Sequence, residues 1–260
     1  MMNKKFILSL TMLGCLSLAS VGFAANFSVS ADEMDYNMQT GDGVAKGNVV
    51  ILQDGGKATC NTATFNSKRK SGTLNGNVVA KRGDETIVCN QFVAHNENDL
   101  SAIGGAVVTK GGRSLSSDRI DYYKSRDFAE TTGGWARLRD NDGSVLNAAK
   151  IDYDMKSGVA NAYGGVTIDS DARKLTASAD SAIYKTGDKD GYVELIGNAK
   201  ATQDGNTVMG KKLRLNNSNV AVGDGDVKIH YVPKPQPAKK EEQIAKDDAS
   251  VKVNDKEAKA

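Results

Sequence analysis

Acidic side chains, which could act as general bases or metal ligands, are common in this chain, but no pair of them has surroundings that would shift a pKa. His95 and His230 are its only histidines, so there is no metal-spaced histidine cluster. The sequence also lacks a Gly-x-Ser-x-Gly nucleophile motif and a phosphate-binding loop. We therefore predict no catalytic residues, no metal site, no cofactor and no enzymatic activity, with His95 serving as an ordinary wall residue.

Cys60 and Cys89 could form a disulfide in an oxidising compartment, and strand geometry decides whether they do. If each repeat unit is one coil of a parallel stack, equivalent residues lie about 4.8 Å apart, which is within reach of a bridge. If each unit is an antiparallel strand pair, they lie about 9.6 Å apart, which is too far. We favour two small buried thiols, because free cysteine packs as a small hydrophobic residue.

Two short segments resemble fragments of calcium-binding loops, Asp140-Asn-Asp142-Gly143 and Asp188-Lys-Asp190-Gly191. Neither has the full ligand set of such a loop, and both fall where the repeat pattern needs a turn. Because Asp-Gly is typical of turns, we interpret both segments as turns and not as metal sites.

The clearest shared pattern belongs to apolar and aromatic residues that recur on one face of successive predicted strands. Such a column is usually packed core, although it also suits the acyl chains of a lipid if the surrounding sheets leave it incompletely filled. Small residues assigned to the same column, Ala63, Ala149 and Ala182, favour incomplete filling. The residues predicted to line this lipid-binding groove are Met34, Tyr36, Phe65, Ile120, Tyr122, Ile151, Tyr153, Tyr184 and Leu213.

These residues belong to an internal repeat. An apolar-x-aromatic triplet, such as Met34-Asp-Tyr36 or Ile120-Asp-Tyr122, recurs at steps of 27 to 31 residues, and the third unit aligns Val93-Ala-His95 with it. A glycine kink accompanies each triplet, as in Gly47-Asn-Val49 and Gly197-Asn-Ala199. A period of this length predicts a stacked architecture in which each unit buries its face only against its neighbours.

The repeat region has the pattern of an all-β protein. All three prolines of the chain lie after Val232, which fits paired strands because proline lacks the donor that a strand ladder needs. Each unit predicts two strands, the longer of which bends at the glycine kink, giving roughly fourteen strands in all. The bends should fold two sheet faces towards each other in an elongated stack, and a parallel β-solenoid is the alternative.

The ends of the chain differ from the repeats. Residues 1–25 combine a basic start at Lys4-Lys5 with an uncharged apolar run and small residues before a cut after Ala24, which predicts a secretory signal peptide. An uncleaved membrane anchor and a lipoprotein site at Cys15 are the alternatives. Residues 26–232 form the repeat domain. Residues 233–260 open with a Pro-rich linker and have few large aliphatic side chains, so we expect disorder there.

The repeated sequence pattern resembles that of the OstA-like (LptA) family of periplasmic lipopolysaccharide-transport proteins. The similarity covers about residues 27–231 and is carried by the Asp-Tyr triplets together with Ala45-Lys-Gly-Asn-Val49 and Leu74-Asn-Gly-Asn-Val78. The resemblance implies a half-open, twisted β-jellyroll that holds lipid A acyl chains in its groove. It also implies head-to-tail self-association, and edge-strand pairing with inner- and outer-membrane transport components to form a bridge between the two membranes.

Net charge narrows the function classes further. The formal charge is +2, and the residues before Asn26 contribute two lysines and no acid, so the exported chain is nearly neutral. Without a basic excess or a stacking motif we expect no nucleic-acid partner. We interpret the chain as a non-enzymatic periplasmic carrier of lipopolysaccharide. The alternatives are a membrane-anchored sister component, an exported structural or adhesive β-repeat protein with a packed core, and a β-solenoid enzyme acting on polysaccharide.

Overall fold

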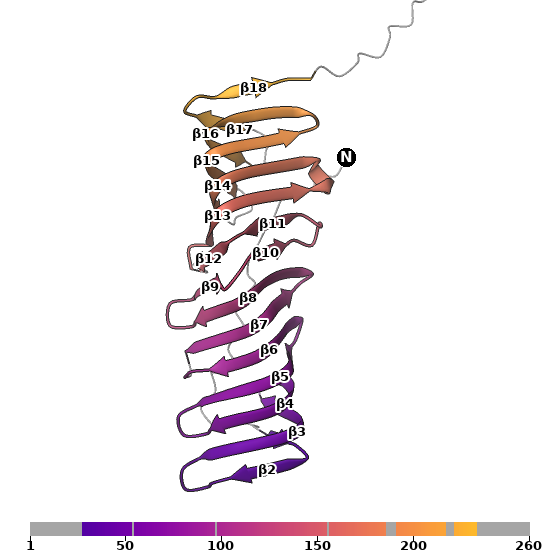
Figure 1. Ribbon diagram of the computed structural model, residues 1–260, viewed down its shortest axis with the longest axis vertical. Coiled ribbons are helices and arrows are strands. Elements are labelled where there is room, and N and C mark those ends of the chain that lie inside the picture. The colour runs from indigo at the N-terminus through magenta and orange to yellow at the C-terminus, as the bar shows by residue number, and fades with distance from the viewer. Residues whose placement is uncertain are drawn as a thin grey trace, which may run out of the picture.

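A computed structural model describes residues 28–53, 55–96, 98–154, 156–185, 191–216 and 221–232. These residues form one antiparallel β-sheet whose strands are stacked along a single long axis (Figure 1). The strands are β1 (Ser28–Ser30), β2 (Glu33–Tyr36), β3 (Asp42–Gln53), β4 (Gly56–Asn66), β5 (Ser71–Arg82), β6 (Glu85–Ala94), β7 (Asp99–Lys110), β8 (Arg113–Tyr123), β9 (Phe128–Thr132), β10 (Ala136–Arg139), β11 (Val145–Ala148), β12 (Lys150–Asp154), β13 (Val159–Ser170), β14 (Leu175–Lys185), β15 (Tyr192–Gln203), β16 (Asn206–Asn216), β17 (Ala221–Asp224) and β18 (Lys228–His230). A 3-10 helix, η2 (Asp171–Arg173), lies between β13 and β14.

Strand pairing follows the order of the chain. Successive strands pair from β3 to β8 and from β13 to β16, and every pairing among the described residues is antiparallel. Short turns such as 83–84 and 204–205 cause this, because a two-residue turn can only return the chain antiparallel. The predicted all-β stack is therefore confirmed, and the parallel β-solenoid alternative is wrong.

The long strands bend where the ladder register shifts, as the glycine kinks predict. In β3 the shift falls at Gly47-Asn48, whose φ angles are 74° and 48°. Glycine suits this position because a Cβ on Gly47 would lie 2.2 Å from a carboxylate oxygen of Asp32. Gly-Asn pairs with positive φ also bend β5 at Gly76-Asn77 and β15 at Gly197-Asn198.

The bends line up along the stack and divide the sheet into two walls that face each other. Four long strands are interrupted at the bend and so appear as the pairs β1/β2, β9/β10, β11/β12 and β17/β18. If each pair is counted as one strand, the eighteen described strands become fourteen, the number predicted from the repeat. The first wall consists of residues 33–36, 42–46, 62–66, 71–75, 91–94, 99–103, 119–123, 128–132, 150–154, 159–163, 181–185, 192–196, 212–216 and 221–224. The second wall consists of residues 28–30, 49–53, 56–60, 78–82, 85–89, 106–110, 113–117, 136–139, 145–148, 166–170, 175–179, 199–203, 206–210 and 228–230.

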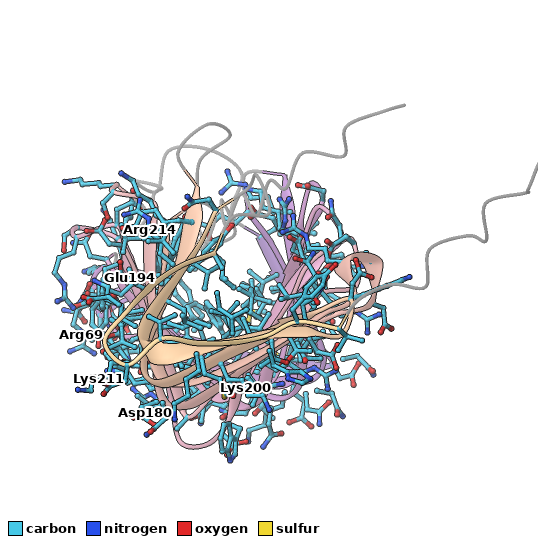
Figure 2. All side chains as sticks on the ribbon, turned by 90° about the horizontal axis from the view of Figure 1, so that it is seen from above. Arg69, Asp180, Glu194, Lys200, Lys211 and Arg214 are labelled. Carbon is cyan, nitrogen blue, oxygen red and sulfur yellow. The ribbon has the colours of Figure 1, made fainter. Side chains whose placement is uncertain are left out.

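Seen along the stack, the two walls meet at a corner and side chains from both fill the space between them (Figure 2). Asp180 and Lys211 lie at the corner, Glu194 and Arg214 on the outside of the first wall, and Lys200 on the outside of the second. We call the side opposite the corner, where the turns between strands gather, the mouth.

The hydrophobic core occupies the space between the walls. Its largest fully buried apolar side chains come from both, with Ile120, Leu195 and Leu213 from the first wall and Val49, Val78 and Val166 from the second. Directly beside the corner the second wall contributes valines on some strands (Val49, Val78 and Val166) and alanines on others (Ala106, Ala136 and Ala148), all of them fully buried. Where an alanine lies beside the bend, as at Ala106, its small side chain lets the walls approach closely.

None of the elements in the described part of the chain is a helix long and apolar enough to cross a membrane. The predicted signal peptide (1–25) and the predicted disordered tail (233–260) lie outside the described residues, as do Asp188 and Asp190 of the second acidic segment.

Candidate functional site

The nine residues predicted to line a groove all lie on the inner face of the first wall, on strands from β2 to β16. Their burial depends on their place in the stack. Tyr36 on the first strands is 46 % exposed, with its ring stacked on that of Phe65, whereas Ile120 in the middle is 1 % exposed. The structure therefore joins the predicted residues into one column, packs the middle of that column as core and exposes its N-terminal end.

His95 does not belong to this column, so its predicted place in the wall is wrong. Gly72 pairs with Phe65 on one side and with Ala94 on the other, which makes Ala94 the counterpart of Phe65. His95 follows β6 and lies on the outside of the first wall, where its Nε2 is 2.9 Å from Ser101 Oγ. The repeat alignment was one residue out of register in this unit, and a one-residue slip reverses the face of a strand.

Of the three small residues that favoured incomplete filling, two belong to the column. Ala63 and Ala182 are buried on the inner face. Ala149 is instead exposed at the corner, where it lies against Gly164 of the neighbouring strand, so its assignment to the inner face is wrong. The bend is the physical reason, because alternation along the strand restarts on the far side of a bulge.

A cavity of ≈ 60 Å³ lies between the two walls in the C-terminal half of the stack. Tyr184 is the member of the predicted set that lines it. The rest of the apolar lining comes from the second wall (Leu138, Val145, Leu146 and Ile168), from Leu175 at its edge, and from Tyr192, Val193 and Leu215 of the first wall. This volume is well below the roughly 300 Å³ of a small ligand pocket, so a lipid chain enters only if the walls separate.

The second-wall lining was missed by the sequence analysis, which followed the aromatic triplets of the first wall. A signal was present, because Val145–Ala148 and Val166–Ser170 alternate in the period-2 pattern of a half-buried strand. These segments contain no aromatic residue and lie on the other side of the bend from the triplet, so no repeated landmark singled them out.

The polar part of the cavity lies on the second wall beside the mouth. Arg113 Nε donates a hydrogen bond of 2.8 Å to Asp140 Oδ1, and the Asp140 side chain is only 5 % exposed. The hydroxyl oxygens of Ser144 and Ser170 are 2.6 Å apart. Arg173, from η2, lines the same cavity, and burial lowers the pKa of its guanidinium. We call Arg113, Asp140, Ser144, Ser170 and Arg173 the polar lip.

The acidic segment from Asp140 to Gly143 forms a turn, as predicted. Asp142 Oδ1 accepts the backbone N–H of Ser144 at 2.8 Å, and Asp140 Oδ1 accepts that of Asn141 at 2.7 Å. Its carboxylates are therefore engaged with the turn and with Arg113. Within the described ranges, no group of three or more His, Cys, Asp or Glu side chains is placed to hold a metal ion.

A buried polar network on the outside of the first wall contains a serine, a histidine and an aspartate. Ser101 Oγ donates to Asp121 Oδ1 at 2.5 Å, and Arg119 Nε donates to both oxygens of the same carboxylate. In a nucleophilic triad the serine proton passes to a histidine that the acid orients. Here the serine proton is directed to the carboxylate, and Ser101 is only 1 % exposed. The network thus braces β7 against β8 without the geometry of a nucleophile.

Cys60 on β4 and Cys89 on β6 are buried free thiols on the inner face of the second wall. β5 lies between these two strands, which is the antiparallel arrangement that places the thiols too far apart for a bridge. The preference for small buried thiols is therefore confirmed. Burial raises the pKa of both, and that of Cys89 rises to about 11.

Both ends of the stack expose strand edges and apolar side chains. Among the described strands, β1 and β2 pair only with β3, and β17 and β18 pair only with β16. The exposed apolar residues near the first end are Met34, Tyr36, Met38, Val44 and Leu52, and those near the second end are Val222, Val227, Ile229, Tyr231 and Val232. Edges of this kind can pair with the strands of another chain.

Comparison with known proteins places the chain beside a transport family. A family model described as LptA/(LptD N-terminal domain) LPS transport protein matches residues 57–159 and 158–221. No curated protein matches the chain. Among solved structures, it is similar to the crystal structure of LptH, the LptA homologous periplasmic component of the conserved lipopolysaccharide transport device from Pseudomonas aeruginosa. That match has 15 % identity and a TM-score of 0.18, and it covers 80 % of this chain and 96 % of that one.

Proposed function

The chain belongs to the family of LptA/(LptD N-terminal domain) LPS transport proteins, and from that premise we propose that it is a non-enzymatic periplasmic carrier of lipopolysaccharide. The lipid's acyl chains lie between the two walls, and its sugars and phosphates lie beyond the mouth. The observation that carries this proposal is the apolar column, which runs along the inner face of the first wall from β2 to β16 and is exposed at its N-terminal end.

The architecture supports entry of a chain between the walls. The ladder hydrogen bonds run along each wall, and the walls are joined covalently at the corner. They can therefore move apart at the mouth by rotation about the bends without loss of ladder hydrogen bonds. Each CH₂ group that then leaves water contributes about 0.8 kcal/mol, which opposes the cost of displacing the side chains between the walls.

Two tyrosines of similar exposure on opposite faces of the first wall allow a direct test of where the lipid lies. Tyr36 is on the inner face and is 46 % exposed, while Tyr163 on the outside is 42 % exposed. A photo-crosslinking phenylalanine analogue at position 36 should capture lipopolysaccharide in living cells, and the same analogue at position 163 should not. The adduct is detected by immunoblotting against the lipid. Equal capture at both positions, or none at either, would contradict carriage between the walls and favour a structural β-repeat protein.

The carrier also assembles end to end, and its edge strands pair with inner- and outer-membrane transport components to form a bridge. The unpaired edges of β2 and β17 and the apolar residues around them support this part of the proposal. The two contact surfaces lie at opposite ends of an elongated stack, so each added copy continues along the long axis and produces an open filament instead of a closed ring.

The matched pair Ile229→Glu and Val88→Glu tests this assembly. Both residues are exposed apolar side chains. Ile229 lies on the last strand, whereas Val88 lies on the outer face of the second wall, on β6, away from both ends of the stack. Because a charge at the contact must be desolvated, Ile229→Glu should weaken self-association at least tenfold, and Val88→Glu should leave it within about twofold. Light scattering over a concentration series measures both, and identical behaviour of the two variants would count against end-to-end contact.

A further inference from the structure

The corner of the stack carries a row of asparagines that the proposed function does not use. This corner, where Figure 2 labels Asp180 and Lys211, lies on the opposite side of the molecule from the mouth. Four successive strands, β3 to β6, each place one exposed asparagine there, in the gap between the paired residues of the two walls. We call this row the asparagine ridge, and its members are Asn48, Asn61, Asn77 and Asn90. Successive members belong to neighbouring strands, which are about 4.8 Å apart.

Backbone geometry explains only half of this row. Asn48 and Asn77 have φ angles of 48° and 50°, a region that asparagine tolerates better than most residues. Asn61 and Asn90 do not have positive φ, so the backbone does not require asparagine at either position. The fold therefore accounts for the two members that follow a glycine and leaves the other two without a conformational reason.

Most amide groups of the ridge are also unused by the fold. At its N-terminal end Asn48 Nδ2 donates to Asp32 Oδ2 at 2.9 Å, and at the equivalent bend of β15 Asn198 Nδ2 donates to Asp180 Oδ2 at 3.0 Å. Within the ranges that the structure describes, the side-chain amides of the other three members make no hydrogen bond to another residue. Each amide has two donor hydrogens and an acceptor oxygen, so these three can bind a ligand that offers both kinds of partner.

The surface around the ridge is uncharged, although 25 % of the residues in the chain carry a charge. The bends of β4 to β7 and the positions beside them contain no Lys, Arg, Asp or Glu over residues 59–62, 75–79, 88–91 and 103–107. Gln91 Nε2 donates to Asn75 Oδ1 at 2.7 Å, which adds two amides on the first-wall side of the ridge. Charged side chains return at Lys46 on β3 and at Asp118 on β8. This surface therefore matches an uncharged partner rich in hydroxyl and amide groups, and offers no counter-charge to an ionic one.

The single tryptophan of the chain lies on the same corner. Trp135, between β9 and β10, is 64 % exposed. A Cβ built on Gly165 would lie 3.8 Å from Cη2 of Trp135, so the ring reaches along the corner to the bend of β13. Between the ridge and this ring, the bend of β7 has the exposed Gly104 and Gly105, which present backbone without side chains. The face of an indole ring carries partial negative charge and attracts the polarised C–H groups of a sugar ring.

We propose that the corner binds an extended glycan strand that bears N-acetyl groups, with Trp135 stacked on one sugar and the asparagine ridge hydrogen-bonded to others. An extended β-linked glycan advances by about one strand spacing per sugar, so successive sugars keep step with the ridge. An acetamido group is itself an amide and therefore matches the donor and acceptor of an asparagine side chain. The site goes beyond lipid carriage and does not depend on it. Because the corner faces away from the mouth, a bound glycan leaves the path of the lipid open.

The test uses chitohexaose, an N-acetylated β-linked glycan, and cellohexaose, which has the same linkage without the acetamido groups. Because Trp135 is the only tryptophan, its fluorescence reports directly on binding at the corner. Calorimetry measures the affinity of the unmodified protein, of Trp135→Ala and of Asn90→Ala. The matched controls are Tyr231→Ala, which removes a 67 % exposed ring at the C-terminal end of the stack, and Asn141→Ala, which removes an exposed amide from a turn at the mouth. Circular dichroism melts confirm that each variant is folded.

We expect chitohexaose to shift the fluorescence of Trp135 saturably and to bind on the order of tenfold more tightly than cellohexaose. Trp135→Ala should weaken the binding of chitohexaose roughly tenfold or more, because buried tryptophans dominate contacts of this kind. Asn90→Ala should weaken it about fivefold, which corresponds to one neutral hydrogen bond, and both controls should stay within about twofold. Lipid capture at position 36 should be unchanged in Trp135→Ala, since the mouth is not altered.

Several results would overturn the site. Binding of chitohexaose that survives Trp135→Ala, or that the controls weaken equally, would place the glycan elsewhere. Equal binding of the two glycans would overturn the assignment of N-acetyl groups. If chitohexaose does not bind and Trp135→Ala instead lowers self-association in light scattering, the corner is a contact between copies of the chain and the glycan proposal is wrong.

Discussion

The two walls contribute to the interior in different ways. The first wall presents a column in which large side chains such as Ile120, Tyr153 and Leu213 alternate with alanines and are buried from the middle of the stack to β16. The second wall presents small residues beside the corner, such as Ala106, and a charged lip beside the mouth. One wall is therefore apolar nearly to its edge, and the other changes from apolar to charged within the length of one strand.

This difference shows how one repeat builds a wedge-shaped interior. Where the second wall has alanine directly after the bend, as at Ala106 and Ala199, the walls can meet closely, and large residues such as Ile120 and Tyr153 keep them apart further out. The first wall should then supply most of the packing energy, while the second sets the spacing and the polarity of the mouth. The predictions below test this division, beginning with the largest expected effect.

Truncation on the first wall should destabilise the fold most. Ile120→Ala removes a side chain that is 1 % exposed and leaves a cavity, so we expect a loss of about 2–5 kcal/mol in the free energy of unfolding. Cys89→Ala on the second wall removes a single buried sulfur atom and should cost about 1 kcal/mol. Urea denaturation measures both. Equal losses would show that the walls share the packing energy and would break the comparison.

Enlargement on the second wall should also destabilise the fold, by a smaller amount. Ala106 is fully buried directly after the bend of β7, so Ala106→Leu should force the walls apart and cost about 1–3 kcal/mol. The control is Ala221→Leu, at an exposed position on β17, which should change stability by less than about 0.5 kcal/mol. A neutral Ala106→Leu variant would mean that the walls are not closely apposed at the corner.

The smallest effect concerns pH. Burial holds the pKa of Cys89 at about 11, above its ordinary value of 9.0, so the folded state keeps a proton that the unfolded chain loses. Stability is therefore unaffected by this thiol below its ordinary pKa and falls as pH rises towards 11, by about 1 kcal/mol at pH 10. Relative to Cys89→Ala, the unmodified protein should lose that amount between pH 7.5 and 10 in urea titrations (pH values chosen to bracket the ordinary thiol pKa). Parallel curves would indicate that Cys89 is accessible to water.

The sequence by itself determined the stack, the bends and the apolar column. Period-2 alternation marks which side chains share a face, and Gly47-Asn48 and its equivalents mark where a strand must adopt positive φ. Both signals are local, so the triplets at Ile120 and Ile151 were assigned to the inner face from the sequence alone. Whether neighbouring strands run parallel or antiparallel depends on contacts between units and not on local pattern. The parallel solenoid therefore stayed an alternative until the antiparallel pairing of the strands excluded it.

The tertiary structure decided what depends on register and on contact between the walls. The ladder places Ala94, and not His95, opposite Gly72, because hydrogen bonding fixes the pairing where the sequence alignment could slip by one residue. The bend likewise leaves Ala149 outside. The polar lip arises because Arg113, Asp140 and Arg173, which belong to different strands and turns, are brought to one side of the mouth. Their proximity comes from the folding of the sheet upon itself, which no repeat within the sequence encodes.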